Sequence, residues 1–287
     1  MDTSQAMKNL EELRLSCKKA YGMIAVSVIG FFVSMFIIPF CPYLFILTFG
    51  FAFLAIPFAK KAKESEKQFQ YVYKEMFAKS ILQELFGDVT CDWNIGYSEL
   101  AVDKIGLVQK GNRFSSEDYI RGQYDGVPFE QSDVVIKQVV RSGKHTRTYT
   151  YFEGRMFSFD LPRNDIGSVV IFSKSFLYQG NCNRMRHEKI DMESQEFNKN
   201  FKVKSINPHD AFYVLTPQIM ECIEQLYRKY GNVAMRFIGG KLHVAINIKG
   251  NAFNGNYRKP IVYVEEKNKI MQDSNVIIDI VKTLKMA

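Results

Sequence analysis

Charged side chains are missing from one long stretch of this chain. Between Ala20 and Ala59 the sequence contains no Asp, Glu, Lys, Arg or His. Phe and Ile would occur on every face of a helix through these residues, which leaves no polar stripe for water and indicates a membrane segment. A buried hairpin of a soluble protein and a cleaved signal peptide are the alternatives. The run is far longer than a signal-peptide core and lacks a small-x-small cleavage site, so the second fits poorly.

The uncharged run is too long for a single straight span. At 1.5 Å per residue, about 40 residues form a helix of ~60 Å, twice the ~30 Å hydrocarbon core. Pro39 and Pro42 interrupt the run near its middle, where proline removes backbone donors and disfavours helix. We therefore predict a helical hairpin with membrane spans from Ala20 to Ile38 and from Tyr43 to Ala59. Gly30 would let the two arms approach closely.

The flanking lysines predict the topology of this hairpin. Lys18 and Lys19 precede the first arm, Lys60 and Lys61 follow the second, and the connecting turn carries no charge. The positive-inside rule then places both termini in the cytoplasm. Five scattered cysteines with no Cys-x-x-Cys pair agree with a reducing compartment. We expect an integral, multi-pass protein of the inner cell membrane.

Recognised catalytic and cofactor motifs are also missing. The sequence has no phosphate-binding loop, no Gly-x-Gly-x-x-Gly fingerprint, no His-Glu-x-x-His and no Gly-x-Ser-x-Gly. Cys182 with His187 is the nearest approach to a ligand pair, and its spacing matches no standard zinc pattern. We predict no catalytic residue, no cofactor and no metal site, and hence a protein that is not an enzyme. Each of the four histidines also has a local structural interpretation: His145, His187, His209 and His243.

Positive charge is concentrated in the body of the chain. The formal net charge is +8, and residues 1–59 contribute only +1 of it, from four basic and three acidic side chains. A basic body tethered at a membrane is attracted to anionic headgroups. No recognisable nucleic-acid module is present, so nucleic acid is not an expected partner. Two basic loops are the candidate contacts for an anionic lipid or an acidic partner, with ordinary solvated surface as the alternative that composition favours: Arg141, Lys144, Arg147, Arg184, Arg186 and Lys189.

Around the hairpin the chain predicts two helical segments. Residues 1–19 form an amphipathic helix that either lies at the membrane interface or packs on the body. Residues 60–87 form a stalk helix whose apolar stripe is interpreted as core packing rather than a coiled-coil seam. Residues 88–287 form the cytoplasmic domain.

Within that domain the fold class is α+β, with an antiparallel sheet flanked by helices. Tight turns at Asp125-Gly126, Glu153-Gly154 and Gly239-Gly240 join β-forming segments and exclude crossover helices. Residues 141–147 and 180–194 are expected to be loops, and residues 197–203 to be extended. Helices are predicted from four starting points: Ser98, Asn207-Pro208, Thr216-Pro217 and Ser274.

With these segments placed, the chain resembles a bacterial membrane-associated family known as domain-of-unknown-function family 3137. The resemblance rests on Phe69 with Tyr73-Lys74 and on Glu117–Gly122, Phe152–Phe157, Phe201–Val203 and Asp210–Pro217. It spans roughly residues 65 to 285. The family has no established activity, so the resemblance implies no catalytic residue.

Three functions are compatible with this organisation. The first is a membrane-anchored protein whose cytoplasmic domain binds a lipid or protein partner at the inner membrane face. The second is an enzyme acting on a membrane-proximal substrate, which would need a polar pocket with converging ionisable groups. The third is an accessory subunit of a larger membrane complex, in which the two arms pack against other spans. The sequence does not predict the oligomeric state.

Overall fold

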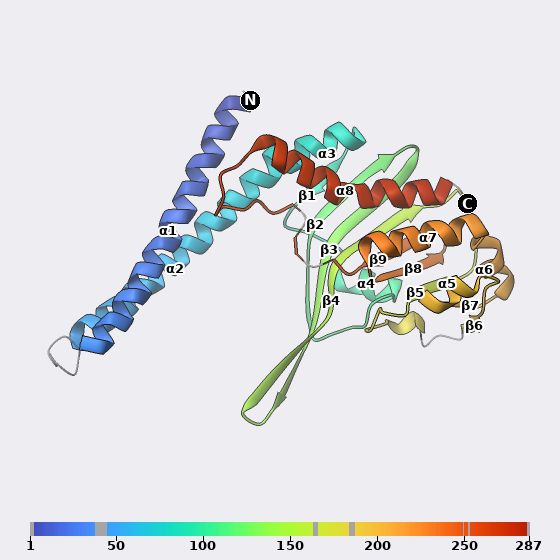
Figure 1. Ribbon diagram of the computed structural model, residues 1–287, viewed down its shortest axis with the longest axis horizontal. Coiled ribbons are helices and arrows are strands. Elements are labelled where there is room, and N and C mark those ends of the chain that lie inside the picture. Colours follow the sequence, from blue (N-terminus) through green and yellow to red (C-terminus); the bar gives the residue numbers. More distant parts are fainter. Residues whose placement is uncertain are drawn as a thin grey trace. The chain divides into compact units, whose positions relative to one another are not determined.

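The computed structural model describes residues 3–37, 45–162, 166–183, 187–248, 250–251 and 253–285. The chain divides into two units, residues 1–81 with 253–270 and residues 82–252 with 271–287 (Figure 1). The first unit is helical, and the second contains the β-sheet. Helix α8, Tyr263–Lys285, contributes residues to both units.

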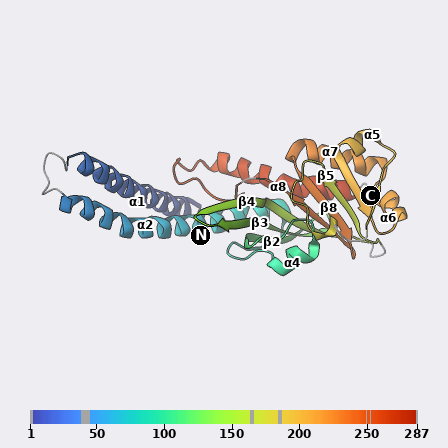
Figure 2. The ribbon, with the colours of Figure 1, turned by 90° about the horizontal axis from the view of Figure 1, so that it is seen from below.

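Two long helices form the first unit. Helix α1, Thr3–Ile37, runs without a break through the predicted amphipathic segment and most of the first predicted span. Helix α2, Phe45–Tyr73, likewise joins the second span to the stalk, and the predicted turn between the arms lies outside the described residues. After α2 come one π-helical turn, η2, Lys74–Ala78, and the helix α3, Lys79–Phe86. Figure 2 shows α1 and α2 side by side.

Helices α1 and α2 pack along one continuous seam. The buried positions on each helix are three, four, seven or fourteen residues apart, which keeps them on one face, as in a helix pair wound like a coiled coil. The N-terminal segment thus packs against α2. The stripe of the stalk continues beyond this pair, where the Tyr73 hydroxyl donates to Glu266 and the Phe77 ring packs on Tyr263, both residues of α8. The buried seam residues are Leu10, Arg14, Cys17, Ala20, Ser27 and Ser34 on α1, with Thr48, Ala62, Ser65, Phe69 and Tyr73 on α2.

The second unit is built on a nine-stranded sheet with the order β1-β2-β3-β4-β9-β8-β5-β7-β6. Every strand pair is antiparallel, as the tight turns predict. The strands are β1 Thr90–Asp92, β2 Arg113–Tyr124, β3 Val127–Ser142, β4 His145–Asp160, β5 Val169–Ser173, β6 Glu188–Ile190, β7 Phe201–Ser205, β8 Val233–Ile238 and β9 Lys241–Ile246.

Helices cover both faces of this sheet. Apolar side chains of α7 and α8 meet Met235, Phe237 and Leu242 on one face. Helix α4 packs on the other face, where Val102 and Ile105 join a core with Phe152, Val170 and Ala234. The helices of this unit are α4 Glu99–Ile105, η3 Asn181–Asn183, α5 Gln195–Asn200, α6 Pro208–Val214 and α7 Pro217–Tyr230, with residues 271–285 of α8.

Local sequence signals account for the helix starts. The side chains of Ser98, Asn207 and Thr216 each accept a hydrogen bond from a backbone N–H in the first turn of α4, α6 and α7. Asp125 and Gly126 both have positive φ, as a tight hairpin turn between β2 and β3 requires. These helix starts and the β2–β3 and β8–β9 hairpins are confirmed.

The predicted turn at Glu153-Gly154 is wrong. Strand β4 passes through both residues and stays paired with β3, because Glu153 lies opposite Val135 and Gly154 opposite Val134. A Cβ atom at Gly154 would lie 2.1 Å from the backbone oxygen of Ile246. This glycine therefore permits close backbone contact inside the sheet instead of a reversal of the chain.

Three further predictions need correction. Residues 141–147 are not a loop. Strand β3 continues to Ser142 and β4 begins at His145, and these two residues are paired. The segment expected to be extended is so only from Phe201, where β7 begins, because residues 195–200 form α5, a helix capped by Ser194. Helix α8 starts at Tyr263, eleven residues before the predicted start at Ser274, because its first turns are too polar to show an apolar period.

Candidate functional site

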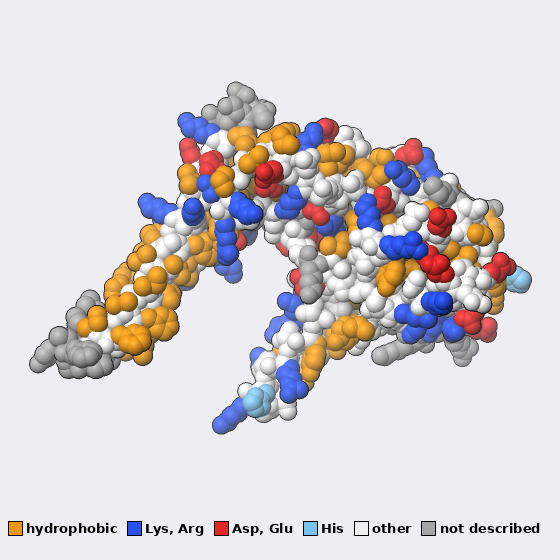
Figure 3. Space-filling view, viewed as in Figure 1, with side chains coloured by type: hydrophobic (Ala, Val, Ile, Leu, Met, Phe, Trp, Pro, Cys, Tyr) orange, Lys and Arg blue, Asp and Glu red, His pale blue; other side chains and the backbone are white. Residues whose placement is uncertain are grey.

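The apolar half of the helix pair presents a continuous hydrophobic surface. Phe36, Ile46 and Phe53 have 80%, 78% and 77% of their surface exposed. No charged residue interrupts this region, and Figure 3 shows the hydrophobic side chains gathered along it. Exposed patches of this size mark contact with lipid or with another apolar surface. We call it the apolar sleeve, and it comprises Val26, Val28, Ile29, Phe32, Val33, Met35, Phe36, Ile37, Ile46, Phe49, Phe53, Leu54 and Ile56.

The inside of the same region is polar or small. The Ser27 hydroxyl donates to the carbonyl oxygen of Met23 at 2.9 Å, and both Ser27 and Ser34 are buried. A Cβ atom at Gly30 would lie 2.7 Å from the ring of Phe51, so this glycine lets α1 and α2 approach closely, as predicted. Small residues inside and large apolar residues outside are typical of helix pairs in membranes.

Within the described residues, one helical segment, Met7–Ile37, is long and apolar enough to cross a membrane. The length and composition of this segment support one candidate N-terminal membrane helix.

Polar and aromatic groups surround the base of the apolar sleeve. The Tyr21 hydroxyl donates to the carboxylate of Glu66, and the Tyr257 ring stacks on the Tyr21 ring at a centroid distance of 5.1 Å. Arg14 donates to the carbonyl oxygen of Tyr257 at 3.4 Å. The Arg258 guanidinium lies 5.7 Å from the centroid of the Tyr257 ring. All of these residues belong to the first unit.

The first predicted basic loop is the end of a two-stranded ribbon. Beyond Lys137, β3 has no partner other than β4, and β4 pairs with β9 only from Arg155 onward. Residues 138–151 therefore form a ribbon with open edges, which we call the basic ribbon. Arg141, Lys144 and Arg147 are all exposed on it. No Asp or Glu occurs between residues 134 and 152, so the ribbon is uniformly positive.

A groove lies at the base of the basic ribbon. It has a volume of about 460 Å³ and is lined by Asn112, Arg113, Val139 and Arg141. The Asn112 side chain fixes one wall through two 2.8 Å hydrogen bonds with the backbone of Val139. Among the described residues neither arginine has an acidic partner. The sequence analysis missed Arg113, which only the pairing of β2 with β3 brings to the ribbon.

The second predicted basic loop is only partly described. Arg184 and Arg186 lie outside the described residues. Lys189 lies on the edge strand β6 and forms an exposed ion pair with Asp191 at 2.8 Å. An exposed pair of this kind contributes little to stability and leaves the lysine accessible. The structure thus gathers three of the six candidates on the basic ribbon and places Lys189 on a separate strand.

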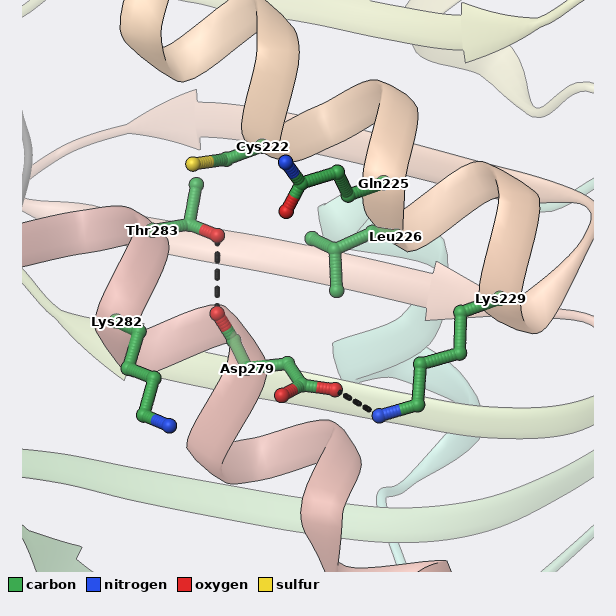
Figure 4. A pocket seen from close by; sticks show the side chains of 7 residues that line it. All are labelled: Cys222, Gln225, Leu226, Lys229, Asp279, Lys282 and Thr283. Atoms are coloured by element: carbon green, nitrogen blue, oxygen red, sulfur yellow. Dashed lines mark hydrogen bonds and ion pairs between the residues drawn. The ribbon is translucent and has the colours of Figure 1, made fainter.

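A polar pocket lies between α7 and α8, with a volume of about 280 Å³ (Figure 4). The Asp279 carboxylate accepts hydrogen bonds from Lys229 Nζ and the Tyr230 hydroxyl, each at 2.6 Å. Burial and this carboxylate raise the pKa of Tyr230 to about 12. The hydrogen bonds from Lys229 to Asp279 and Tyr230 raise the pKa of the lysine. Both groups stay protonated at neutral pH. The pocket is lined by Cys222, Gln225, Leu226, Lys229, Asp279, Lys282 and Thr283.

A row of polar side chains crosses the α4 face of the sheet. His243 Nδ1 lies 2.8 Å from the Ser158 hydroxyl, and the Tyr97 hydroxyl donates to Ser158 at 3.2 Å. Burial, with smaller effects of Lys241 and Arg236, lowers the pKa of His243 to about 4. His243 is therefore uncharged at neutral pH, and it shares the Ser158 hydroxyl with the buried Tyr97.

Arg155 forms the polar centre of the opposite face. Its guanidinium donates to the backbone oxygen of Asp273 at 2.7 Å and to its carboxylate at 2.9 Å. Asp133 lies 3.9 Å away, and Arg155 is only 2% exposed. These contacts attach residues 271–285 of α8 to the sheet, because a buried charge needs compensation nearby.

Cys182 and His187, whose spacing matches no zinc pattern, each have partners of their own. Cys182 is buried in the core beside α4, and His187 Nε2 lies 2.9 Å from the Ser168 hydroxyl. No group of three or more potential metal ligands occurs among the residues that the structure describes.

These features define a class of protein, an α+β protein whose N-terminal helical pair carries an exposed apolar sleeve. Residues 150–286 match the model of a family described as "Protein of unknown function (DUF3137)". This match confirms the resemblance over the last three of the quoted body stretches. Glu117–Gly122 and the stalk lie outside the matched region.

One solved structure shows a distant similarity. The crystal structure of the mycobacterial trehalose monomycolate transport factor A, TtfA, aligns with 72% of this chain and 93% of its own. The sequence identity is 12% and the TM-score is 0.35. No curated protein sequence matches the chain significantly.

Proposed function

We propose that this protein is a non-enzymatic, membrane-anchored protein of the inner cell membrane, with two spans and both termini in the cytoplasm. The apolar sleeve carries this proposal, because burial of so many large apolar side chains in lipid is strongly favourable. Residues 20–38 and 43–59 form the two arms. The uncharged part of α2 runs from Phe45 to Ala59 and is about 22 Å long, which is short for crossing a hydrocarbon core.

The partner that best fits the body is the anionic surface of the same membrane. The basic ribbon supports this choice, since it combines exposed Arg141, Lys144 and Arg147 with exposed Val140 and Tyr149. Arginine fits phosphate groups through several donors, and amphipathic tyrosine suits the headgroup layer. The groove lined by Arg113 and Arg141 would accept one phosphate-sized group. Each basic residue near an anionic leaflet contributes about 1 kcal/mol.

The pocket between α7 and α8 supports a binding protein over an enzyme. Its carboxylate is engaged by Lys229 and Tyr230, both of which remain protonated at neutral pH. A general base needs a free acceptor with a pKa near the working pH. The alternative of a subunit in a larger membrane complex uses the same sleeve, with other spans taking the place of lipid.

Hydrogen–deuterium exchange of the full chain in nanodiscs tests this function. Exchange in residues 138–151 should slow in anionic nanodiscs relative to neutral ones and recover in high salt, where charges are screened. The Arg141→Gln/Lys144→Gln/Arg147→Gln variant should lose the difference. The control variant Lys199→Gln/Lys202→Gln changes exposed lysines elsewhere on the body and should keep the difference in exchange between anionic and neutral nanodiscs. Equal exchange in both lipids would exclude the basic ribbon as the lipid contact and direct attention to protein partners.

A further inference from the structure

A segment of the first unit, residues 253–262, forms a strap along the helix pair. Its beginning is fixed by a double hydrogen bond, in which Gln70 accepts from the Gly255 N–H at 2.8 Å and donates to the Gly255 carbonyl at 2.9 Å. Directly after the strap, the Tyr263 ring packs 5.7 Å from the ring of Phe77. The strap is therefore attached at its beginning to the charged part of α2 and at its end to η2.

Between these attachments the strap reaches toward the apolar sleeve. Its Tyr257 stacks on Tyr21, whose hydroxyl donates to Glu66. Along the chain, Glu66 is nearer to the uncharged arm than the two attachment points, Gln70 and Phe77. Only six residues, or about 9 Å of helix, separate Glu66 from Lys60 at the end of that arm. The headgroup layer on each side of a bilayer is roughly 5–8 Å thick. Glu66 thus lies at the outer edge of this layer, whereas Tyr21 is the second residue of the first uncharged arm. Because Tyr257 stacks on Tyr21, the strap apex, residues 257–260, lies at headgroup depth when the sleeve is in the membrane.

The chemistry of the strap apex suits this depth. Arg258, Lys259 and Pro260 are exposed, while Tyr257 is held between Tyr21 and the Arg258 guanidinium. No Asp or Glu occurs from residue 247 to residue 264. Figure 3 shows further Lys and Arg side chains where the sleeve begins. Tyrosine with exposed cations at the end of an apolar segment is characteristic of membrane interfaces.

We propose that the strap apex is a second membrane contact, in which Arg258 and Lys259 bind the phosphates of anionic phospholipid headgroups. Stacking on Tyr21 holds Tyr257 at the interface and presents the two cations to the lipid surface. The inference rests on the proposed anchoring by the sleeve and is independent of the basic ribbon. It gives the membrane-anchored unit a lipid preference of its own.

Tryptophan reporters in the full chain test this contact in vesicles that carry nitroxide-labelled lipids. Tyr257→Trp keeps an aromatic ring on Tyr21 and reports from the strap apex. Phe53→Trp reports from the sleeve, and exposed Leu177→Trp reports from the second unit as a control. The single native Trp93 is buried, so its signal in the parent chain can be subtracted.

The expected result is quenching of the Tyr257→Trp reporter by a headgroup nitroxide, stronger in anionic than in neutral vesicles. Adding Arg258→Glu/Lys259→Glu should remove this anionic excess, and adding the charge-matched Lys199→Glu/Lys202→Glu should leave it in place. An unquenched Tyr257→Trp reporter, beside a Phe53→Trp reporter that deep nitroxides quench, would overturn the inference and leave the anchoring intact. Quenching that does not depend on lipid charge would also overturn it. An unquenched Phe53→Trp reporter would refute the anchoring itself.

Discussion

Substitution of Gly154 distinguishes a strand position from a turn position. The structure places a Cβ of this residue 2.1 Å from the Ile246 oxygen and 2.8 Å from the Ile248 nitrogen, both backbone atoms of a neighbouring segment. Overpacking of a core costs about 1–3 kcal/mol, and backbone neighbours cannot move aside by rotating a side chain. Gly154→Ala should therefore cost about 3 kcal/mol. In a unit of this size that corresponds to a fall of roughly 6–12 °C in Tm.

Asparagine provides the decisive comparison. At a turn with positive φ, asparagine replaces glycine better than alanine does, whereas at a close contact it is worse because it is larger. Gly126 is the matched control, with φ of +82° and no atom within 4 Å of an added Cβ. Thermal unfolding of the detergent-solubilised chain, followed by circular dichroism, should rank Asn below Ala at position 154 and above Ala at position 126. The same order at both positions, with Asn above Ala, would refute the strand assignment.

Three further predictions concern the charged core, the buried histidine and the helix pair. Arg155→Met should cost roughly 3–5 kcal/mol in chemical denaturation, because it leaves buried carboxylates without their cation, and adding Asp133→Asn should recover part of the loss. The pKa of His243 falls from 6.5 to about 4 on folding, so the unfolded chain takes up a proton more readily than the folded one. The free energy of unfolding should therefore be independent of this histidine above pH 6.5 and decline by up to about 3 kcal/mol as the pH falls to 4. His243→Gln should flatten this pH dependence in urea titrations, and an unchanged slope would exclude the assignment. Gly30→Leu should disrupt packing of the helix pair, seen as faster proteolysis in membranes, while Gly50→Leu, which meets no neighbour, should not.

Local signals in the sequence predicted much of the fold. Ser98 and Thr216 indicate helix starts through a capping side chain, and Asp125-Gly126 indicates a turn through residues that tolerate positive φ. These features depend on a few neighbouring residues, so one sequence suffices to find them. The uncharged run is equally local, and it led directly to the apolar sleeve.

Features that depend on distant partners could not be predicted in this way. Gly154 has the sequence appearance of a turn, and only the backbone at Ile246 explains why a glycine is needed within a strand. The groove at the basic ribbon joins Arg113 to Arg141 through strand pairing. The strap likewise brings Tyr257 to Tyr21 across most of the chain length.

We propose above that the helix pair crosses the membrane twice, with the body inside the cell. The native cysteines test it directly, because Cys41 lies in the sequence between the two predicted spans and Cys222 lies on α7. Intact spheroplasts of a bacterial host would be treated with a membrane-impermeant maleimide before and after lysis. If the helix pair spans the membrane in this way, Cys41 should be labelled without lysis and Cys222 only after it. Labelling of Cys41 only after lysis, or of Cys222 in intact spheroplasts, would contradict it.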